Sequence, residues 1–315
     1  MMLKIRRFVQ GQDEKRWIAL WNKVCFEFEE FRALTIDDMT AFEKSPSFDI
    51  EGVFLAEFGN EPVGLAYAQV DRFREEKKGL IQVLMVVPEH RRKGIGRKLT
   101  VKAVESFKER GMEAVEGFAF GQRKEAIGLF ESMGFRQVRV LSLMKRGLGR
   151  LPQNISENRE VSLRRLNSQD RGDVELLTFL ENETFKEHYN FRPASIEEVV
   201  HMLKENPTFP EQEWFFANLN DKTVGYVGTG VDPQYNKERN TRVGWIMDIG
   251  VLKSHRRKGI GTRLMIEGIK LLTAKAMSQV MLGVDDQNPT KAIKLYQKVG
   301  FQAIRKDLAF QKTIQ

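Results

Sequence analysis

The sequence holds a single cysteine, Cys25, among 315 residues. One cysteine cannot form a disulfide within the chain, and no histidine lies close to it in the sequence to activate a thiol. The residues around Cys25 have the periodicity of an amphipathic helix. We therefore expect a small core residue here rather than a nucleophile.

Long apolar runs are also absent. No segment approaches the ~20 apolar residues that a membrane-spanning helix requires. The stretch from Met1 to Phe8 alternates and carries charge, so it does not resemble a secretory signal. These absences favour a soluble, cytoplasmic protein with no membrane partner.

Histidines are few, and none of the four falls in a His-Glu-x-x-His arrangement. His188 and His201 are isolated in the sequence, whereas His90 and His255 open a repeated basic turn. We expect surface or capping roles for these side chains and no metal site.

The basic residues outnumber the acidic ones, 51 against 43, which gives a formal net charge of +8. Six of them lie in two identical turns, and the others are interspersed with Asp and Glu, as on an ordinary solvated surface. Nucleic-acid binding is not favoured, because the basic residues are not interleaved with aromatic ones. A small anionic ligand explains the excess better.

One heptapeptide occurs twice. The residues from His90 to Gly96, His-Arg-Arg-Lys-Gly-Ile-Gly, return unchanged 165 positions later from His255 to Gly261. Each copy follows an apolar run and opens a helical pattern, which predicts a strand that turns directly into a helix. Neither copy is a Walker A loop or a Gly-x-Gly-x-x-Gly dinucleotide motif.

A turn of this kind favours an anion. The first N–H groups of a helix have no intrahelical partner, and the positive end of the helix dipole lies behind them. Glycine removes side chains that would keep a phosphate from the backbone, and Arg-Arg-Lys adds positive charge. Each copy therefore predicts a site for a pyrophosphate-bearing cofactor. The alternative is a basic turn with a glycine cap, which the repetition in matching contexts disfavours.

The repeat extends through the whole chain, with a period far above that of a solenoid, so it indicates a domain duplication. We expect domains at residues 1–148 and 159–315, joined by a polar linker at 149–158. The first half predicts helices at 14–30, 36–44, from the basic turn to about 110, and 124–133, with strands at 4–9, 53–58, 63–71, 80–87, 114–120 and 140–144. The second half predicts helices at 171–184, 196–204 and from 260, with strands at 161–166, 214–219, 223–231 and 245–252.

A second paired feature lies downstream of each turn. Residues 126–135 and 292–301 share the pattern Ala-Ile-x-Leu-aromatic-x-x-x-Gly-Phe. The aromatic residue is Phe130 in the first half and Tyr296 in the second. Only the second half precedes the pattern with Asn-Pro, which predicts a helix that starts at Asn288.

These motifs carry a family resemblance that spans both halves. The Arg-x-x-Gly-x-Gly pattern, which begins at Arg256 and at Arg91, matches the acyl-CoA motif of GNAT-type N-acetyltransferases. The stretch from Asn288 to Phe301 resembles another signature of that family. The chain therefore resembles a tandem, two-domain GNAT protein.

The resemblance implies an α/β fold in which each domain is a mixed, splayed β-sheet flanked by helices. Acetyl-CoA would lie between the strand that ends at Val251 and the strand that ends near Asp285. Its pantetheine arm would pair with the first strand's edge, and an amide there would polarise the thioester carbonyl. The implied cofactor contacts of the second half are Ile249, Gly250, Val251, Arg256, Arg257, Lys258, Gly259, Ile260, Gly261, Thr262 and Asn288. Those of the first half are Leu84, Val86, Arg91, Arg92, Lys93, Gly94, Ile95, Gly96 and Arg97.

The implied reaction is direct attack of a primary amine on acetyl-CoA. Tyr296 is the expected general acid, which would protonate the departing thiolate. The alternative is a core aromatic, as Phe130 must be. Asp248 is one candidate base, although its side chain should point away from the sheet face of Ile249 and Val251. The other candidates are a chain of waters, Asp285, Asp286 and Glu213.

The first half departs from the family pattern at Gln122, Arg123 and Phe130. These departures argue against catalysis there but not against cofactor binding. We expect a catalytic second domain and a first domain that binds CoA weakly or shapes the acceptor site. The alternative to an enzyme is a non-catalytic acyl-CoA sensor. The sequence leaves the acceptor, the acyl length and the oligomeric state open.

Overall fold

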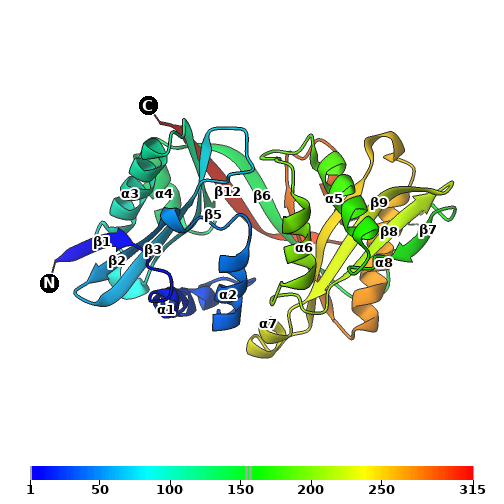
Figure 1. Cartoon of the computed structure of the whole chain (residues 1–315). Coiled ribbons are helices and arrows are strands. Elements are labelled where there is room, and N and C mark those ends of the chain that lie inside the picture. Colours follow the sequence, from blue (N-terminus) through cyan, green and yellow to red (C-terminus); the bar gives the residue numbers. More distant parts are fainter. Residues whose placement is uncertain (1, 153–154, 156–157, 315) are drawn as a thin grey trace. The chain divides into compact units, whose positions relative to one another are not determined.

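The computed structural model of the chain describes residues 2–152, 155 and 158–314. They divide into two compact units (Figure 1). The first contains the chain up to residue 139 and from residue 307 onward, and the second contains residues 140–306. Part of the expected linker at 149–158 lies outside the described residues.

The first unit is a sheet with the strand order β1-β2-β3-β4-β5-β12, in which only β4 and β5 are parallel. Helices α1 and α2 cover one face, and α3 and α4 cover the other (Figure 1). Its elements are β1 (Leu3–Arg7), α1 (Glu14–Val24), α2 (Ile36–Lys44), β2 (Val53–Phe58), β3 (Glu61–Gln69), β4 (Lys78–Val86), α3 (Ile95–Glu109), β5 (Ala114–Phe120), α4 (Lys124–Ser132) and the end of β12 (Gln302–Thr313).

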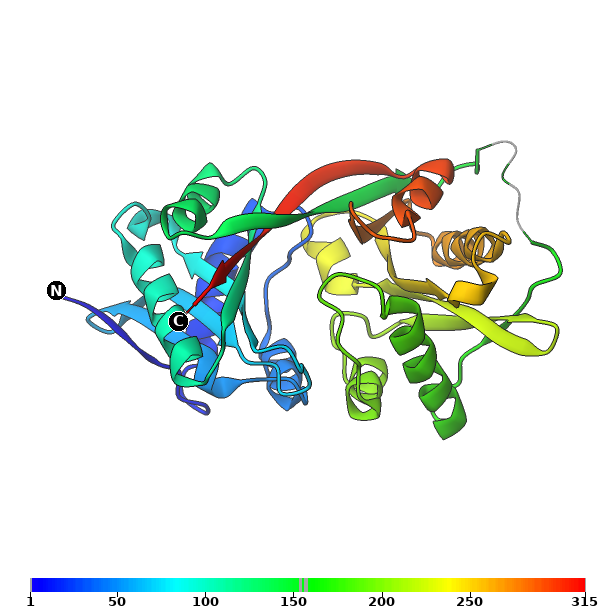
Figure 2. The ribbon, with the colours of Figure 1, turned by 90° about the horizontal axis from the view of Figure 1, so that it is seen from above.

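The second unit repeats this plan with the strand order β7-β8-β9-β10-β11-β6. Helices α5 and α6 lie on one face and α8 and α9 on the other (Figure 2). Its elements are most of β6 (Arg136–Gly147), β7 (Ser162–Arg165), α5 (Arg171–Phe185), α6 (Ile196–Lys204), β8 (Glu213–Leu219), β9 (Lys222–Val231), α7 (Pro233–Glu238), β10 (Val243–Val251), α8 (Ile260–Ala274), β11 (Gln279–Asp285), α9 (Ala292–Lys298) and the start of β12.

The last strand of each sequence half joins the sheet of the other half. β6 follows α4 in the chain, yet its residues Leu141–Gly147 pair antiparallel with β11. β12 follows α9, yet its residues Asp307–Thr313 pair antiparallel with β5. For this reason the compact units do not follow the two halves of the sequence.

Both sheets are splayed, as predicted. β4 pairs with β5 only from Lys78 to Ile81, and β10 pairs with β11 only from Val243 to Trp245. Just beyond these points each strand carries one extra residue, Gln82 in β4 and Met247 in β10, relative to its antiparallel neighbour. A β-bulge of this kind bends and twists the strand. It opens the sheet at the same place in both halves.

The helix that follows each basic turn packs on its sheet through the predicted face. The buried residues include Ile95, Leu99, Ala103 and Phe107 of α3, and Ile260, Leu264, Gly268 and Leu272 of α8. A Cβ atom on Gly268 would lie 2.7 Å from Cδ1 of Ile246, so the helix approaches the sheet where the residue is small.

Two predicted helix boundaries are wrong. The helix expected at 14–30 ends at Val24 and continues only as a 3₁₀ turn, Cys25–Glu27. The helix expected from Asn288 begins at Ala292. The Oδ1 atom of Asn288 accepts hydrogen bonds from both the amide and the hydroxyl of Thr290, and Lys291 has a φ of 57°. A local side-chain turn has replaced the first helical turn.

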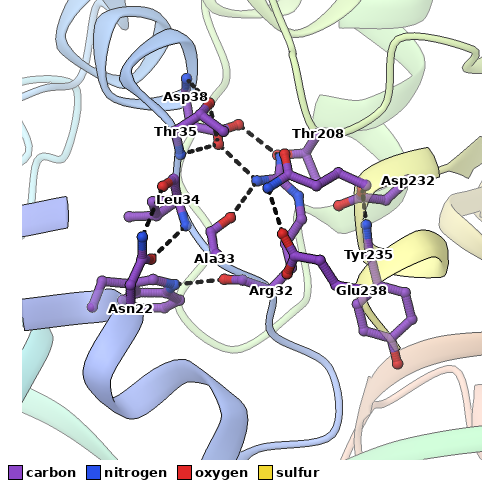
Figure 3. A network of polar contacts seen from close by, with 12 residues as sticks. Asn22, Arg32, Ala33, Leu34, Thr35, Asp38, Thr208, Asp232, Tyr235 and Glu238 are labelled. Carbon is purple, nitrogen blue, oxygen red and sulfur yellow. Dashed lines mark hydrogen bonds and ion pairs between the residues drawn. The ribbon is translucent and has the colours of Figure 1, made fainter. Parts of the chain in front are cut away.

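Matched polar contacts fix the helix pair on one face of each unit. Asn22 exchanges hydrogen bonds with the backbone of Leu34 (Figure 3). Asn182 does the same with the backbone of Ala194. Capping boxes then open α2 at Thr35 and α6 at Ser195. In each half an arginine forms two bonds with the carboxylate of the box, Arg32 with Asp38 and Arg192 with Glu198. A single offset of 160 positions relates these residues.

Low pH should reduce the stability that Asp38 and its hydrogen bonds give to the first unit. Burial alone would raise the pKa of Asp38, but hydrogen bonds from Arg32 and Thr35 bring it below its ordinary 3.8. The ionised carboxylate therefore stabilises the fold above pH 3.8, and this contribution is lost as the pH falls through the lowered pKa. We expect Asp38→Asn to reduce the free energy of unfolding at neutral pH, and the gap from wild type to narrow below pH 3.8.

Urea titrations at several pH values, followed by tryptophan fluorescence, measure this gap. Asp37→Asn is the matched control, because Asp37 is an exposed residue of the same first helical turn. A gap that stays constant from neutral to acid pH would contradict the electrostatic explanation.

Candidate active site

The two basic turns have the same backbone conformation. Arg92 and Arg257 have φ values of 62° and 65°, and Gly94 and Gly259 have φ values of 78° and 77°. The left-handed region is costly for most residues and free for glycine, which explains the glycine at the helix N-cap. Neither N-cap glycine carries a capping side chain, so both helix ends are bare.

The amides of both turns are unused. Within the part of the chain that the structure describes, no N–H group of residues 92–97 or 257–262 donates to a protein acceptor. The first helical hydrogen bonds run from Lys98 to the Gly94 carbonyl and from Arg263 to the Gly259 carbonyl. Each turn thus presents six consecutive amides at the positive end of a 15-residue helix, which is an anion-binding arrangement.

The first arginine of each motif ties the turn to the strand before it. Nε of Arg91 donates to the Val86 carbonyl, and Nε of Arg256 donates to the Val251 carbonyl, both at 3.0 Å. Arg256 also bonds to Glu187 at 3.1 Å. These guanidinium groups are held in place, so the mobile charges of the motif are the exposed residues Arg92, Lys93, Arg257 and Lys258.

Beyond the splay, β10 has one unpaired edge. The Leu252 amide donates to the Val224 carbonyl of β9, and backbone direction alternates along a strand. Ile249 and Val251 therefore turn their backbone groups toward the β11 side, where β11 no longer pairs. The Asp248 carboxylate accepts a hydrogen bond from the Ile249 amide, and Arg256 donates one to the Val251 carbonyl. Neither the Ile249 carbonyl nor the Val251 amide bonds to a described residue on this side, so both are available to an extended ligand.

Asp248 occupies the centre of a polar cluster on the α5 face. Its Oδ2 accepts from the Tyr226 hydroxyl at 2.8 Å, and its Oδ1 accepts from the Ile249 amide at 2.7 Å. Ile249 and Val251 instead pack in the apolar cluster that contains α8. Enclosure by protein raises the pKa of Asp248 to about 6, against the opposing effect of its two hydrogen bonds.

Glu181 of α5 faces this cluster. Burial and the charges of Asp248 and Glu198 raise the pKa of Glu181 to about 8. Among the described residues, no side chain or amide forms a hydrogen bond or ion pair with its carboxylate. The site thus holds two carboxyl groups whose ionisations are linked.

Tyr296 of α9 contributes a phenol from the opposite side of the splay. The ring is buried beside Phe301, at a centroid distance of 6.2 Å. Its hydroxyl makes no hydrogen bond to any described residue. Burial and the charge of Asp248 raise the pKa of Tyr296, so the phenol keeps its proton.

A profile of the acetyltransferase (GNAT) family matches residues 17–135 and 177–301, which together are most of the chain. The chain belongs to the acetyltransferase (GNAT) family. The two matched segments confirm the tandem form predicted from the repeated motifs.

The relatives with similar sequences include several mycothiol acetyltransferases. That of Thermobispora bispora is 31% identical over 147 residues, which are 46% of this chain and 50% of that protein. That of Actinosynnema mirum is 25% identical over 246 residues, which are 78% of each chain. In the first of these matches, and in others like it, the chain spans only about half the length of the relative.

Two solved structures share the fold. A tandem GNAT protein from the clavulanic acid biosynthesis pathway has a TM-score of 0.77 at 14% identity and covers 99% of this chain and 98% of its own. A GCN5-related N-acetyltransferase from Sphaerobacter thermophilus has a TM-score of 0.71 at 20% identity, with coverages of 99% and 96%.

The two GNAT halves differ in the polar cluster. The offsets that align their hydrogen bonds and bulges place an apolar residue of the first half at every polar position of the second half's cluster. The pairs, second half first, are Glu181 and Trp21, Thr184 and Val24, Tyr226 and Leu65, Asp248 and Val83, Tyr296 and Phe130. The first half therefore has no titratable side chain at any of these five positions.

Aromatic side chains gather at the end of β5 in the first half. Phe28 packs against Phe120, the last residue of β5, with ring centroids 4.3 Å apart, and Phe31 packs against both. Arg123 lies 5.0 Å over the Phe28 ring and pairs with Glu27. In the second half the last residue of β11 is Asp285, so the corresponding place is polar.

The other residues expected to take part are engaged elsewhere. Asp285 accepts from the Gln287 amide, and Asp286 accepts from Ser142 and pairs with Lys306. Glu213 pairs with Lys275 at 3.2 Å. Asn288, expected at the cofactor, directs its Oδ1 atom into its own turn. Ile95 and Ile260 are core residues, so they can reach a cofactor only through their amides.

Sequence reasoning missed Glu181 and Tyr226. Both lie on elements far from the motifs in the chain, and neither belongs to a motif. Comparison of the halves supplies a signal, because a carboxylate replaces Trp21 and a phenol replaces Leu65 at otherwise apolar faces.

The structure adds two observations on wider functions. No helix within the described ranges is long and apolar enough to cross a membrane. No group of three or more His, Cys, Asp and Glu side chains among these residues could hold a metal ion. His255 contacts Ser254, and His201 lies 3.9 Å from Glu205.

Proposed function

We propose that the chain is an acetyl-CoA-dependent N-acetyltransferase whose second half performs the reaction. The polar cluster around Asp248 is the observation that supports this assignment, because the first half shares the turn and the splay but has no such cluster. The acceptor is a primary amine, and the acetyl group passes to it directly, without an acyl-enzyme.

The second half offers each part of acetyl-CoA a complementary surface. The diphosphate accepts hydrogen bonds from the amides of residues 257–262, beside the exposed charges of Arg257 and Lys258. The pantetheine arm pairs with the Ile249 carbonyl and the Val251 amide, as an added strand would. The thioester then lies near Asp248, between Glu181 and Tyr296.

The acceptor is open to a direct test. The names of the relatives make a mycothiol-related amine the first compound to try, and amino sugars, amino acids, polyamines and lysine peptides widen the panel. Release of CoA is measured for each amine with acetyl-CoA as the donor. Turnover with at least one amine is expected. CoA binding without turnover for any amine would favour the alternative, an acyl-CoA sensor.

The first half keeps the anion-binding turn and lacks the cluster. We infer that it binds CoA weakly and does not turn it over. The aromatic side chains around Phe28 and Phe120 support this assignment, since they occupy the place where β4 and β5 diverge.

Charge reversal in the turns should separate the two halves. Arg257→Glu should raise KM for acetyl-CoA about 10–100-fold with little change in kcat, because a charge-assisted contact worth about 1.5–3 kcal/mol is lost. Arg257 is a better probe than Arg256, whose guanidinium also holds the turn to Val251. Steady-state kinetics at varied acetyl-CoA measure the effect.

The matched variant in the first half is Arg92→Glu. It should remove only a CoA-binding event that calorimetry detects and that is not coupled to turnover. Loss of turnover in Arg92→Glu with normal kinetics in Arg257→Glu would mean that the halves have the opposite roles.

A further inference from the structure

Asp248 is poorly placed to take a proton from the acceptor amine. Tyr226 and the Ile249 amide each donate to one of its two oxygens, at 2.8 and 2.7 Å. A new donor would have to compete with both. The charge of Asp248 nevertheless acts on every titratable neighbour in the cluster.

Glu181 has the opposite character, since the residue is half-buried and its carboxylate is bonded to no described residue. One turn further along α5, the Thr184 hydroxyl oxygen would lie only 2.5 Å from a Cβ atom on Gly250, so α5 crosses directly over β10. Gly250 and Asp248 share that strand face. Glu181 therefore projects from the helix beside Asp248, at the edge of the splay.

We propose that Glu181 is the general base that accepts the proton of the acceptor ammonium, with Asp248 and Tyr226 as positioning residues. This inference rests on the proposed function, and it names a catalytic group for it. The groups that face Glu181 are Asp248 from β10, Tyr226 from β9 and Glu198 from α6, which Arg192 neutralises. Burial and the charge of Asp248 raise the pKa of Tyr296, which lies on α9.

The surroundings of Glu181 raise its pKa toward that of the ammonium from which it would take a proton. An aliphatic ammonium has a pKa of ~10.4. Transfer of its proton to an ordinary carboxylate near 4.5 is uphill by roughly six powers of ten in equilibrium constant, whereas transfer to a carboxylate near 8 is uphill by roughly two. Asp248 supplies part of this basicity without contacting the substrate.

The proton balance is simple. The ammonium gives one proton to the Glu181 carboxylate, and the neutral nitrogen forms a bond to the thioester carbon. The carbon–sulfur bond then breaks, the thiolate takes a proton from Tyr296, and the nitrogen's second proton returns to the phenolate through solvent. The products are an amide and free CoA thiol, and Glu181 releases one proton to water.

The test uses acetyl-CoA and the most active amine of the panel. Glu181→Gln should lower kcat about 10²–10⁴-fold, as expected for loss of a positioned base, while KM for acetyl-CoA changes little. The rise of kcat with pH toward about 8 should disappear in this variant. Glu183→Gln is the matched control, because Glu183 is exposed on the same helix and should leave kcat unchanged.

Asp248→Asn tests the positioning role. Removal of its charge should lower the pKa of Glu181, so the rising limb of the kcat profile should move to lower pH rather than vanish. A purely structural role for Asp248 would lower activity at all pH values and leave the limb in place.

A titration of the Glu181 carboxyl group without substrate provides an independent test. Infrared difference spectra of wild type and Glu181→Gln should show one carboxyl group that titrates well above its ordinary 4.5. Titration near 4.5 would overturn the inference, and so would wild-type kcat in Glu181→Gln. Absence of CoA release by the wild type with any amine would instead contradict the proposed function, and this inference with it.

Discussion

Removal of β12 should unfold the first compact unit, although this strand lies at the far end of the sequence. Residues Asp307–Thr313 form the strand next to β5, and the Ile314 amide continues the pairing to the Glu113 carbonyl. Phe310 stacks on Phe130 with ring planes 12° apart and centroids 5.5 Å apart. Without the strand, one edge of β5 and one side of that core would face water.

The single change Phe310→Ala should already have a large effect. Phe310 is 1% exposed, and its replacement leaves a cavity against Phe130. Such truncations cost about 3–5 kcal/mol, a large part of the total stability of an ordinary domain. Thr313→Ala is the matched control, because Thr313 is exposed on the same strand.

Tryptophan positions allow each unit to be followed separately. Trp17 and Trp21 belong to the first unit, and Trp214 and Trp245 to the second. Urea unfolding in a background with both second-unit tryptophans changed to phenylalanine reports on the first unit. Equal stability of Phe310→Ala and Thr313→Ala in that background would show that β12 is dispensable.

The exchange of last strands could not be read from the sequence. The pattern at residues 140–144 predicts a strand, and the residues after Phe301 carry no clear prediction. Neither pattern shows which strand would pair with them. Because the halves are duplicates, each last strand meets a similar edge in either sheet. Only the tertiary pairing of Leu141 with Asp285 and of Asp307 with Phe120 decides between them.

The candidate site could likewise be predicted from the sequence only in part. The turn from Arg256 to Thr262 is a local structure, so glycine spacing and helix polarity were enough to predict its bare amides. The cluster around Asp248 is assembled from four elements, and burial rather than sequence motif gives Glu181 its raised pKa. Asn288 shows the opposite error, since Asn-Pro can open a helix or close a side-chain turn, and here it closes a turn.

Duplication also explains how the halves could diverge. The first half retains the bulge at Gln82 and the turn at Arg92, yet each position of the polar cluster is apolar. Its sheet is completed by a strand that follows the helix of Tyr296 directly in the chain. Stability of the first unit therefore depends on the sequence of the second half, which is a reason for both halves to persist even if only one is catalytic.

Tyr296→Phe should lower kcat about 10²-fold, at the low end of the range for a positioned acid, with KM for acetyl-CoA nearly unchanged. The change removes one oxygen from a ring that packs against Phe301, so the fold should tolerate it. In the proposed mechanism, the phenol donates a hydrogen bond to sulfur as negative charge develops there. Because a thiol has a pKa of ~8.5 and the pKa of Tyr296 is raised, complete transfer of the proton is uphill, which limits the effect.

The first half provides the reciprocal control. Phe130→Tyr places a phenol at the matching position, but the carboxylates of the cluster have no counterpart there, so no gain of turnover is expected. Single-turnover kinetics with the active amine distinguish loss of the chemical step from slower product release. If Tyr296→Phe keeps the wild-type single-turnover rate, the phenol is a core aromatic like Phe130, and the leaving thiolate departs without an acid.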